Sequence, residues 1–142
     1  MQKIHLLFRD NTFLKKILRI FPQHAKLSEQ TEWSMEVQVK SALAAEDTDL
    51  IIMDWQYISH LRDLNPVAKV MITSETYDKN KEYLSARLGA KGFITKDMNT
   101  LLIKRAVDTV NAGQIWMTRA VAARVVDEYR RVFRGNKHIP EA

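Results

Sequence analysis

The chain has 142 residues, no cysteine and a formal net charge of +5 at pH 7, and 46% of its residues are hydrophobic. This length suits one domain with a short extension, and the hydrophobic content supports a folded core. The lack of cysteine excludes disulfides, zinc–thiolate sites and thiol catalysis. The N-terminal apolar stretch is too short for a signal peptide and no run approaches membrane-spanning length, so we expect a cytoplasmic protein without membrane contact.

The first half of the chain predicts alternating strands and helices. Strands are expected at residues 3–8, 25–33 and 49–53. Helices are expected at residues 10–22 and 35–45, where apolar residues recur at helical spacing. Only eleven positions, residues 55–65, separate the third strand from Pro66 and the fourth strand. We therefore expect a shortened third helix, of two turns at most, within residues 57–64.

The second half continues the same alternation. Strands are expected at residues 68–72 and 92–95, and helices at residues 78–88, 101–112 and 118–134. Asp78 and Thr118 have side chains suited to helix N-caps, and Gly89 is placed to end the first of these helices. The expected apolar face of the helix at residues 101–112 consists of Leu101, Leu102, Ala106, Val107 and Val110.

The ends of three expected strands carry the candidate site. The apolar runs end on Asp54, on Thr73 and Ser74, and on Lys96. Continuous apolar runs are typical of parallel strands that are buried on both faces. The carboxyl ends of such strands meet at one edge of an open sheet, so these side chains should converge. A carboxylate, a hydroxyl and an ammonium together suit a carboxylate that accepts a phosphoryl group.

Three segments, residues 49–54, 68–73 and 88–97, resemble the receiver domain of bacterial two-component response regulators. The last is the most specific, because it joins a helix end, a glycine-bounded turn, a strand and a terminal lysine. Residues 113–119 are similar to the end of the receiver in LuxR/NarL-type regulators. The resemblance implies a CheY-like fold, which is a flavodoxin-like, doubly wound α/β fold with a five-stranded parallel sheet. We expect a receiver-like domain at residues 1–114 and a helical linker or extension at residues 115–142.

The resemblance also implies roles for the site residues. Asp54 would be the phosphoacceptor, Thr73 and Ser74 would sense the phosphoryl group, and Lys96 would pair with it. Each residue also has a plainer interpretation. Asp54 could cap the helix after it, Thr73 and Ser74 could cap the helix that begins at Asp78, and Lys96 could be a surface lysine without a partner.

Two residues depart from the family pattern. Arg9 and Asp10 stand where the family usually has two acidic residues that help to hold Mg²⁺. We expect Arg9 to pair with Asp54 or Asp10, so that Asp10 and Asp54 bind Mg²⁺ weakly or not at all. The alternative is that Arg9 faces solvent and leaves both carboxylates to hold a weak Mg²⁺. No other cofactor is expected.

The C-terminal helix has an apolar stripe of Val121, Val125, Tyr129 and Val132. A helix of this length is marginal in isolation, so the stripe must be buried. We expect burial in a homodimer; the alternatives are the body of the same domain and a further C-terminal domain. The helix is also rich in arginine, which indicates either a solvated face or a tail that contacts nucleic acid.

The favoured function is a divergent receiver: a regulatory, non-enzymatic module of a LuxR/NarL-type transcription regulator. It would act through dimerisation, would bind DNA only through a domain that this chain lacks, and would have impaired or absent phosphorylation. One alternative is a conventional receiver that a sensor histidine kinase phosphorylates at Asp54. Another is a small flavodoxin-like enzyme or nucleotide binder, which the scattered glycines disfavour.

Overall fold

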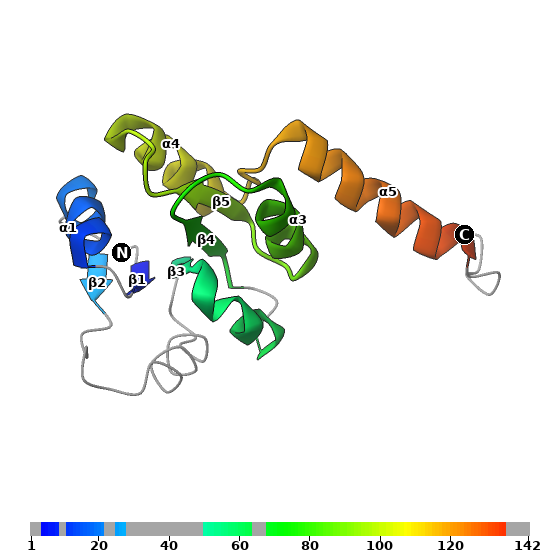
Figure 1. The fold of residues 1–142 in the computed structure, drawn as a ribbon, viewed down its shortest axis with the longest axis horizontal. Helices are drawn as coiled ribbons and strands as arrows, with labels where there is room; N and C mark the ends of the chain where they lie inside the picture. Colours follow the sequence, from blue (N-terminus) through cyan, green and yellow to red (C-terminus); the bar gives the residue numbers. More distant parts are fainter. Residues whose placement is uncertain (1–3, 9–10, 22–24, 28–49, 64–67, 136–142) are drawn as a thin grey trace.

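The computed structural model describes residues 4–8, 11–21, 25–27, 50–63 and 68–135. These residues form a five-stranded parallel sheet with the strand order β2-β1-β3-β4-β5 (Figure 1). The strands are β1 (Ile4–Leu7), β2 (Ala25–Leu27), β3 (Leu50–Asp54), β4 (Val70–Ser74) and β5 (Gly92–Thr95). The strand order reverses between β1 and β3, which makes the sheet doubly wound. The predicted fold class is therefore confirmed.

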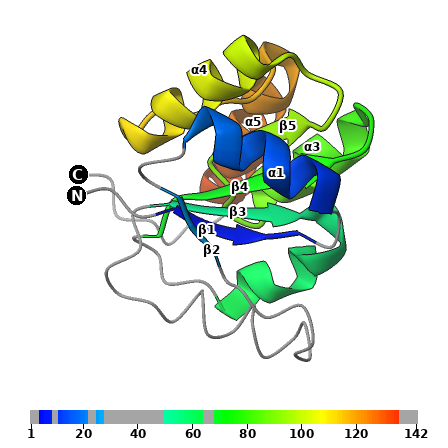
Figure 2. The same cartoon turned by 90° about the vertical axis from the view of Figure 1, so that its left-hand side faces the viewer.

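Helices cover both faces of this sheet. The described helices are α1 (Asn11–Ile20), the 3₁₀ helix η1 (Trp55–Asp63), α3 (Lys79–Arg87), α4 (Thr100–Asn111) and α5 (Arg119–Gly135). Figure 2 shows α1 and α4 on one face of the sheet and η1 on the other. No helix in the described ranges combines the length and apolarity that a bilayer crossing requires.

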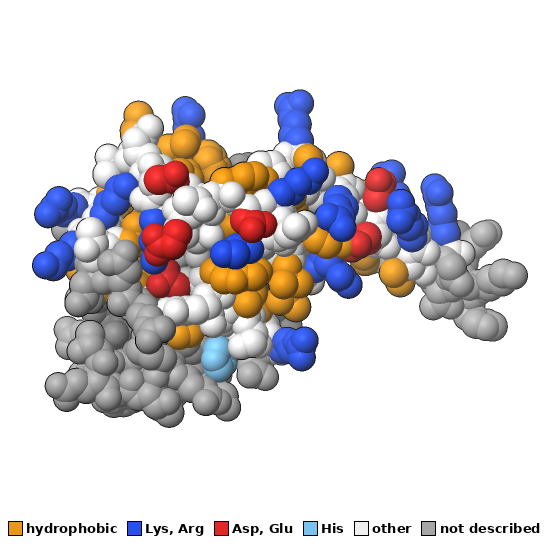
Figure 3. Space-filling view, in the orientation of Figure 1, with side chains coloured by type: hydrophobic (Ala, Val, Ile, Leu, Met, Phe, Trp, Pro, Cys, Tyr) orange, Lys and Arg blue, Asp and Glu red, His pale blue; other side chains and the backbone are white. Residues whose placement is uncertain are grey.

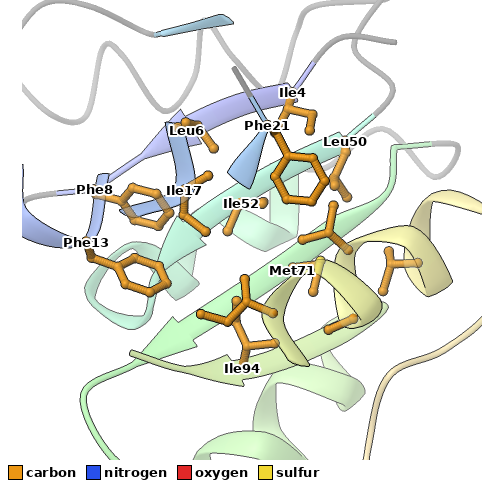
Figure 4. Close-up of a cluster of buried hydrophobic side chains, with 14 residues drawn as sticks. Ile4, Leu6, Phe8, Phe13, Ile17, Phe21, Leu50, Ile52, Met71 and Ile94 are labelled. Atoms are coloured by element: carbon orange, nitrogen blue, oxygen red, sulfur yellow. The ribbon is translucent and has the colours of Figure 1, made fainter. Parts of the chain in front are cut away.

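The central strand β3 explains why the sequence shows no alternation of apolar and polar residues. Leu50 and Ile52 pack into the apolar cluster beneath α1 and α4 (Figure 4). Ile51 and Met53 face the other way and pack into the cluster beneath η1. All four side chains are almost completely buried, and each contributes roughly 1.5–3 kcal/mol relative to an exposed position. Burial on both faces thus keeps β3 in the centre of the sheet.

Helix ends follow the predicted chemistry. The Asp78 carboxylate accepts hydrogen bonds from the backbone N–H groups of Asn80 and Lys81, so Asp78 is the N-cap of α3. Gly89, with φ of +100°, follows the end of α3 in the left-handed conformation that favours glycine. At the start of α4, Asn99 provides the cap by accepting from Leu102 N–H.

Three details of the prediction need correction or lie outside the described residues. The segment after β3 forms nine residues of 3₁₀ helix, about three turns, rather than two turns at most. On α4, Leu101 was expected on the apolar face but is 77% exposed, and Ile103, which was not expected there, is buried. Of the expected strand at residues 25–33 only β2 is described, and the expected helix at residues 35–45 lies outside the described residues.

The final helix α5 starts from a fixed point on the sheet. Trp116 pairs with the β5 region, because its N–H donates to Lys91 O and its carbonyl accepts from Phe93 N–H. The Thr118 hydroxyl then accepts from Val121 N–H at 3.4 Å, which is the predicted cap. The first half of α5 packs against α3, and the second half extends beyond the sheet (Figure 1).

Candidate functional site

Asp54 is the centre of the site at the carboxyl ends of the strands. It is the last residue of β3 and is only 5% exposed. Its Oδ1 accepts a hydrogen bond from Thr73 Oγ1 at 2.5 Å and lies 3.2 Å from Lys96 Nζ. The strand register explains the first contact, since Asp54 and Thr73 are direct partners across β3 and β4. Three neighbouring strands therefore bring a carboxylate, a hydroxyl and an ammonium together.

Lys96 is held between two carboxylates. Its Nζ lies 3.0 Å from Glu75 Oε1 as well as 3.2 Å from Asp54 Oδ1, and its side chain is 11% exposed. Its backbone N–H donates to Ser74 O, which fixes the turn after β5. Burial alone would lower the pKa of Lys96, but its hydrogen bond to Glu75 and the charge of Asp54 outweigh burial and raise the pKa. The ammonium is therefore a fixed positive charge at Asp54.

These groups border a cavity of about 190 Å³. Its lining consists of Asp54, Trp55, Gln56, Thr73, Ser74, Glu75, Lys81 and Lys96. The Lys81 ammonium lies 5.5 Å from the centre of the Trp55 ring, in a cation–π contact at the edge of the cavity. The volume corresponds to about six water molecules, which is room for a phosphoryl group next to Asp54.

The structure brings together four of the predicted site residues: Asp54, Thr73, Ser74 and Lys96. The plainer interpretation of Lys96 as a lysine without a partner is wrong, because it contacts both Asp54 and Glu75. Arg9 and Asp10 lie outside the described residues.

The described residues do not by themselves make a site for Mg²⁺. Among them, no group of three or more histidine, cysteine, aspartate or glutamate side chains could hold a metal ion. Magnesium is usually bound through one or two carboxylates and keeps several waters, and the Asp54 carboxylate also contacts the Lys96 ammonium.

Sequence reasoning missed a second polar cluster, which joins α3 to α5. The Glu82 side chain is only 2% exposed and accepts three hydrogen bonds. Its Oε1 accepts from Tyr77 Oη at 2.8 Å and from Thr118 Oγ1 at 2.7 Å, and its Oε2 accepts from Thr118 N–H at 2.9 Å. In the sequence, this cluster is visible only as an acidic residue, Glu82, in the first turn of α3. That pattern predicts nothing about a contact with α5.

The contact between α3 and α5 continues further along both helices. The Tyr83 hydroxyl donates to the Glu128 carboxylate, and Arg87 lies 3.5 Å from the same carboxylate. The Arg124 guanidinium stacks 3.6 Å from the centre of the Tyr83 ring. Of the predicted stripe, Val121 is fully buried, whereas Tyr129 is 62% and Val132 69% exposed. The first part of the stripe thus docks on its own domain and the second part does not.

Comparison with known proteins supports the fold. No protein-family model and no curated protein matches this chain. Among solved structures, a LuxR-family DNA-binding response regulator from Silicibacter pomeroyi is similar, with a TM-score of 0.66 and 18% identity over 84% of this chain and 99% of that chain. A LuxR-family two-component response regulator from Aurantimonas sp. SI85-9A1 has a TM-score of 0.64 and 15% identity over 91% of this chain and 99% of that chain.

A response regulator from Thermotoga maritima is similar to the same degree, with a TM-score of 0.65 and 16% identity over 79% of this chain and 98% of that chain. At such low identities these similarities establish the fold. The chain has the CheY-like receiver fold, as the sequence resemblance implied.

Proposed function

We propose that this chain is the receiver domain of a LuxR/NarL-type two-component response regulator, a regulatory module rather than an enzyme. The observation that carries the proposal is the cluster of Asp54, Thr73 and Lys96 at the ends of three adjacent strands. Asp54 would be the acceptor, and the 190 Å³ cavity leaves room for the phosphoryl group.

Thr73 and Lys96 have complementary roles in this proposal. A phosphoryl group would add a charge of about −1.5 to −2 at Asp54. The Lys96 ammonium offsets that charge, and the Thr73 hydroxyl exchanges its bond to the carboxylate for one to a phosphoryl oxygen. Both side chains are already within contact distance of Asp54, so neither has to travel far.

We also propose that phosphorylation of Asp54 with the help of Mg²⁺ is impaired. Arg9 occupies a position where the family has a carboxylate, and a guanidinium there repels a divalent cation. The competition between Lys96 and a metal for Asp54 acts in the same direction. The chain would then work with little or no phosphate, through partners that bind one conformation of the receiver.

Treatment with acetyl phosphate and Mg²⁺, followed by intact-mass spectrometry, tests both parts of this proposal. We expect poor labelling of the wild type and higher, Mg²⁺-dependent labelling of the Arg9→Asp variant, because the change removes a cation and adds a ligand. Arg62→Asp is the matched control, since Arg62 is an exposed residue of η1 and does not line the cavity.

Two outcomes would contradict the proposal. Efficient labelling of the wild type that disappears in Asp54→Asn would identify a conventional receiver, which a sensor histidine kinase would phosphorylate. Labelling that persists in Asp54→Asn would place the acceptor elsewhere.

The proposed output is a homodimer formed through α5. Tyr129 and Val132 are 62% and 69% exposed on the half of α5 that extends beyond the sheet, and Val126, in the docked half, is 47% exposed. Val121, in the docked half of α5, is fully buried within its own domain. The extended half therefore offers most of the exposed apolar area of α5 to a second copy. Dimerisation would pair two DNA-binding domains that lie outside this chain.

A further inference from the structure

A second and larger cavity lies beside the Asp54 site, between α1 and the start of α4. Its volume is about 610 Å³, and its polar lining contains four cationic side chains, those of Lys15, Lys16, Arg19 and Lys96. None of the described residues that line it is acidic. Figure 3 shows the Lys and Arg side chains at the end of the molecule formed by α1. Lys96 is paired with Asp54 and Glu75, so the positive charge of the cavity comes mainly from Lys15, Lys16 and Arg19.

Two of the four cations are held in place by the fold. Lys16 Nζ donates to the carbonyl of Met98 at 2.7 Å and to that of Lys96 at 3.3 Å, so α1 reaches across to the loop after β5. Lys96 is fixed by Asp54 and Glu75. Such anchored ammonium groups lose little conformational entropy when an anion binds, which favours affinity.

The other polar groups of the cavity also suit an anion. Lys15 and Arg19 are exposed at its rim, on the same side of α1 as Thr12 and Lys16. Thr12 and Thr100 lie in the first turns of α1 and α4, so the positive ends of two helix dipoles border the cavity. Like charges that share one cavity repel each other, and a bound anion would relieve that repulsion.

We propose that this cavity binds a small phosphorylated ligand of about the size of a mononucleotide. Its volume falls within the range of roughly 300–1,000 Å³ that is usual for small-molecule sites, and it is several times larger than the cavity at Asp54. The phosphate groups lie against Lys16 and the helix starts, and Lys15 and Arg19 close over them. Since Lys96 borders both cavities, a ligand here also bears on the charge balance around Asp54.

Isothermal titration calorimetry of the full chain with pyrophosphate, ADP and inorganic phosphate tests the site. We expect saturable binding of pyrophosphate and ADP, and weaker binding of inorganic phosphate. The double variant Lys15→Gln, Arg19→Gln should weaken binding at least about tenfold, because it removes two charge-assisted hydrogen bonds. The matched control Lys79→Gln, Lys91→Gln removes the same charge from exposed positions outside the cavity and should change the affinity less than about twofold.

Three results would overturn this proposal. One is the absence of saturable binding by pyrophosphate and ADP below about 1 mM. Another is an equal loss in both double variants, which would mean attraction by net charge alone. The third is a short DNA duplex that binds more tightly than ADP and competes with it, which would identify a surface for a polyanion. Asp54→Asn should retain ligand binding, so the failure of this proposal and the failure of phosphorylation at Asp54 are distinguishable.

Discussion

Tyr77, in the loop between β4 and α3, contacts the Glu82 carboxylate that holds the start of α5. Its ring packs edge-on against Phe93, and its hydroxyl donates to buried Glu82. Tyr77 is 53% exposed, so solvent screens much of the effect, but partial burial of its hydroxyl, followed by the hydrogen bond to Glu82, raises its pKa above the ordinary value of about 10. A phenol whose pKa is raised by folding stabilises the fold below that ordinary value, and the stabilisation disappears as the pH rises through the raised pKa.

Alkaline titration followed by phenolate absorbance measures this effect. We expect the Tyr77 phenol to ionise late, and Tyr77→Phe should remove its contribution from the late part of the curve. In Glu82→Gln the same phenol should ionise at lower pH, because the carboxylate that favours its protonated form is gone. An unchanged titration curve in Glu82→Gln would mean that Glu82 does not hold the Tyr77 hydroxyl in solution.

At the scale of elements, Glu82 fastens the start of α5 to α3. A buried carboxylate that accepts three hydrogen bonds leaves its donors unsatisfied when it is changed. We expect Glu82→Gln to lower the free energy of unfolding by about 1–3 kcal/mol in urea titrations. Asp97→Asn, at an exposed position, is the control and should stay within about 0.5 kcal/mol.

Limited digestion with trypsin separates a local effect from a global one. Arg124 stacks on Tyr83 in the docked half of α5, so cleavage after Arg124 should be faster in Glu82→Gln than in the wild type. An equal cleavage rate, together with unchanged stability, would show that Glu82 does not anchor α5.

The strands were predictable from the sequence, whereas this anchor was not. A strand such as β3 buries both faces, so its apolar run is a local signal that needs no knowledge of its neighbours. The bond between Glu82 and Thr118 joins residues 36 positions apart, and no local pattern encodes it. Helical spacing likewise placed Leu101 on the apolar face of α4, although the packing of α1 and β5 buries Ile103 instead.

The same distinction applies to the site. Asp54, Thr73 and Lys96 were predictable because each ends an apolar run and parallel strands end at one edge. Glu75 and Lys81 follow no such rule, and only their positions in space show that they border the same cavity.

At the scale of the whole molecule, the exposed half of α5 predicts self-association. We expect light scattering to show a dimer at high micromolar concentration and a monomer for Tyr129→Glu, Val132→Glu, because charges replace the apolar contact. Val125 is half-buried in the docked half and is left unchanged in this variant. Leu101→Glu is the control, since Leu101, on α4, is even more exposed at 77%, and the change should leave the dimer intact. A wild type that is already monomeric would refute the dimer.

The anchoring of α5 at one end makes it a lever. Glu82 and Trp116 hold its first turn to the body of the domain, and its 17 residues span about 25 Å. Release of the contacts that Tyr83 makes with Arg124 and Glu128, followed by a rotation of about 10° at the anchored end, would displace the far end by about 4 Å. A change in the hydrogen bonds of one buried carboxylate is thereby converted into a movement of several ångströms at the far end of the helix.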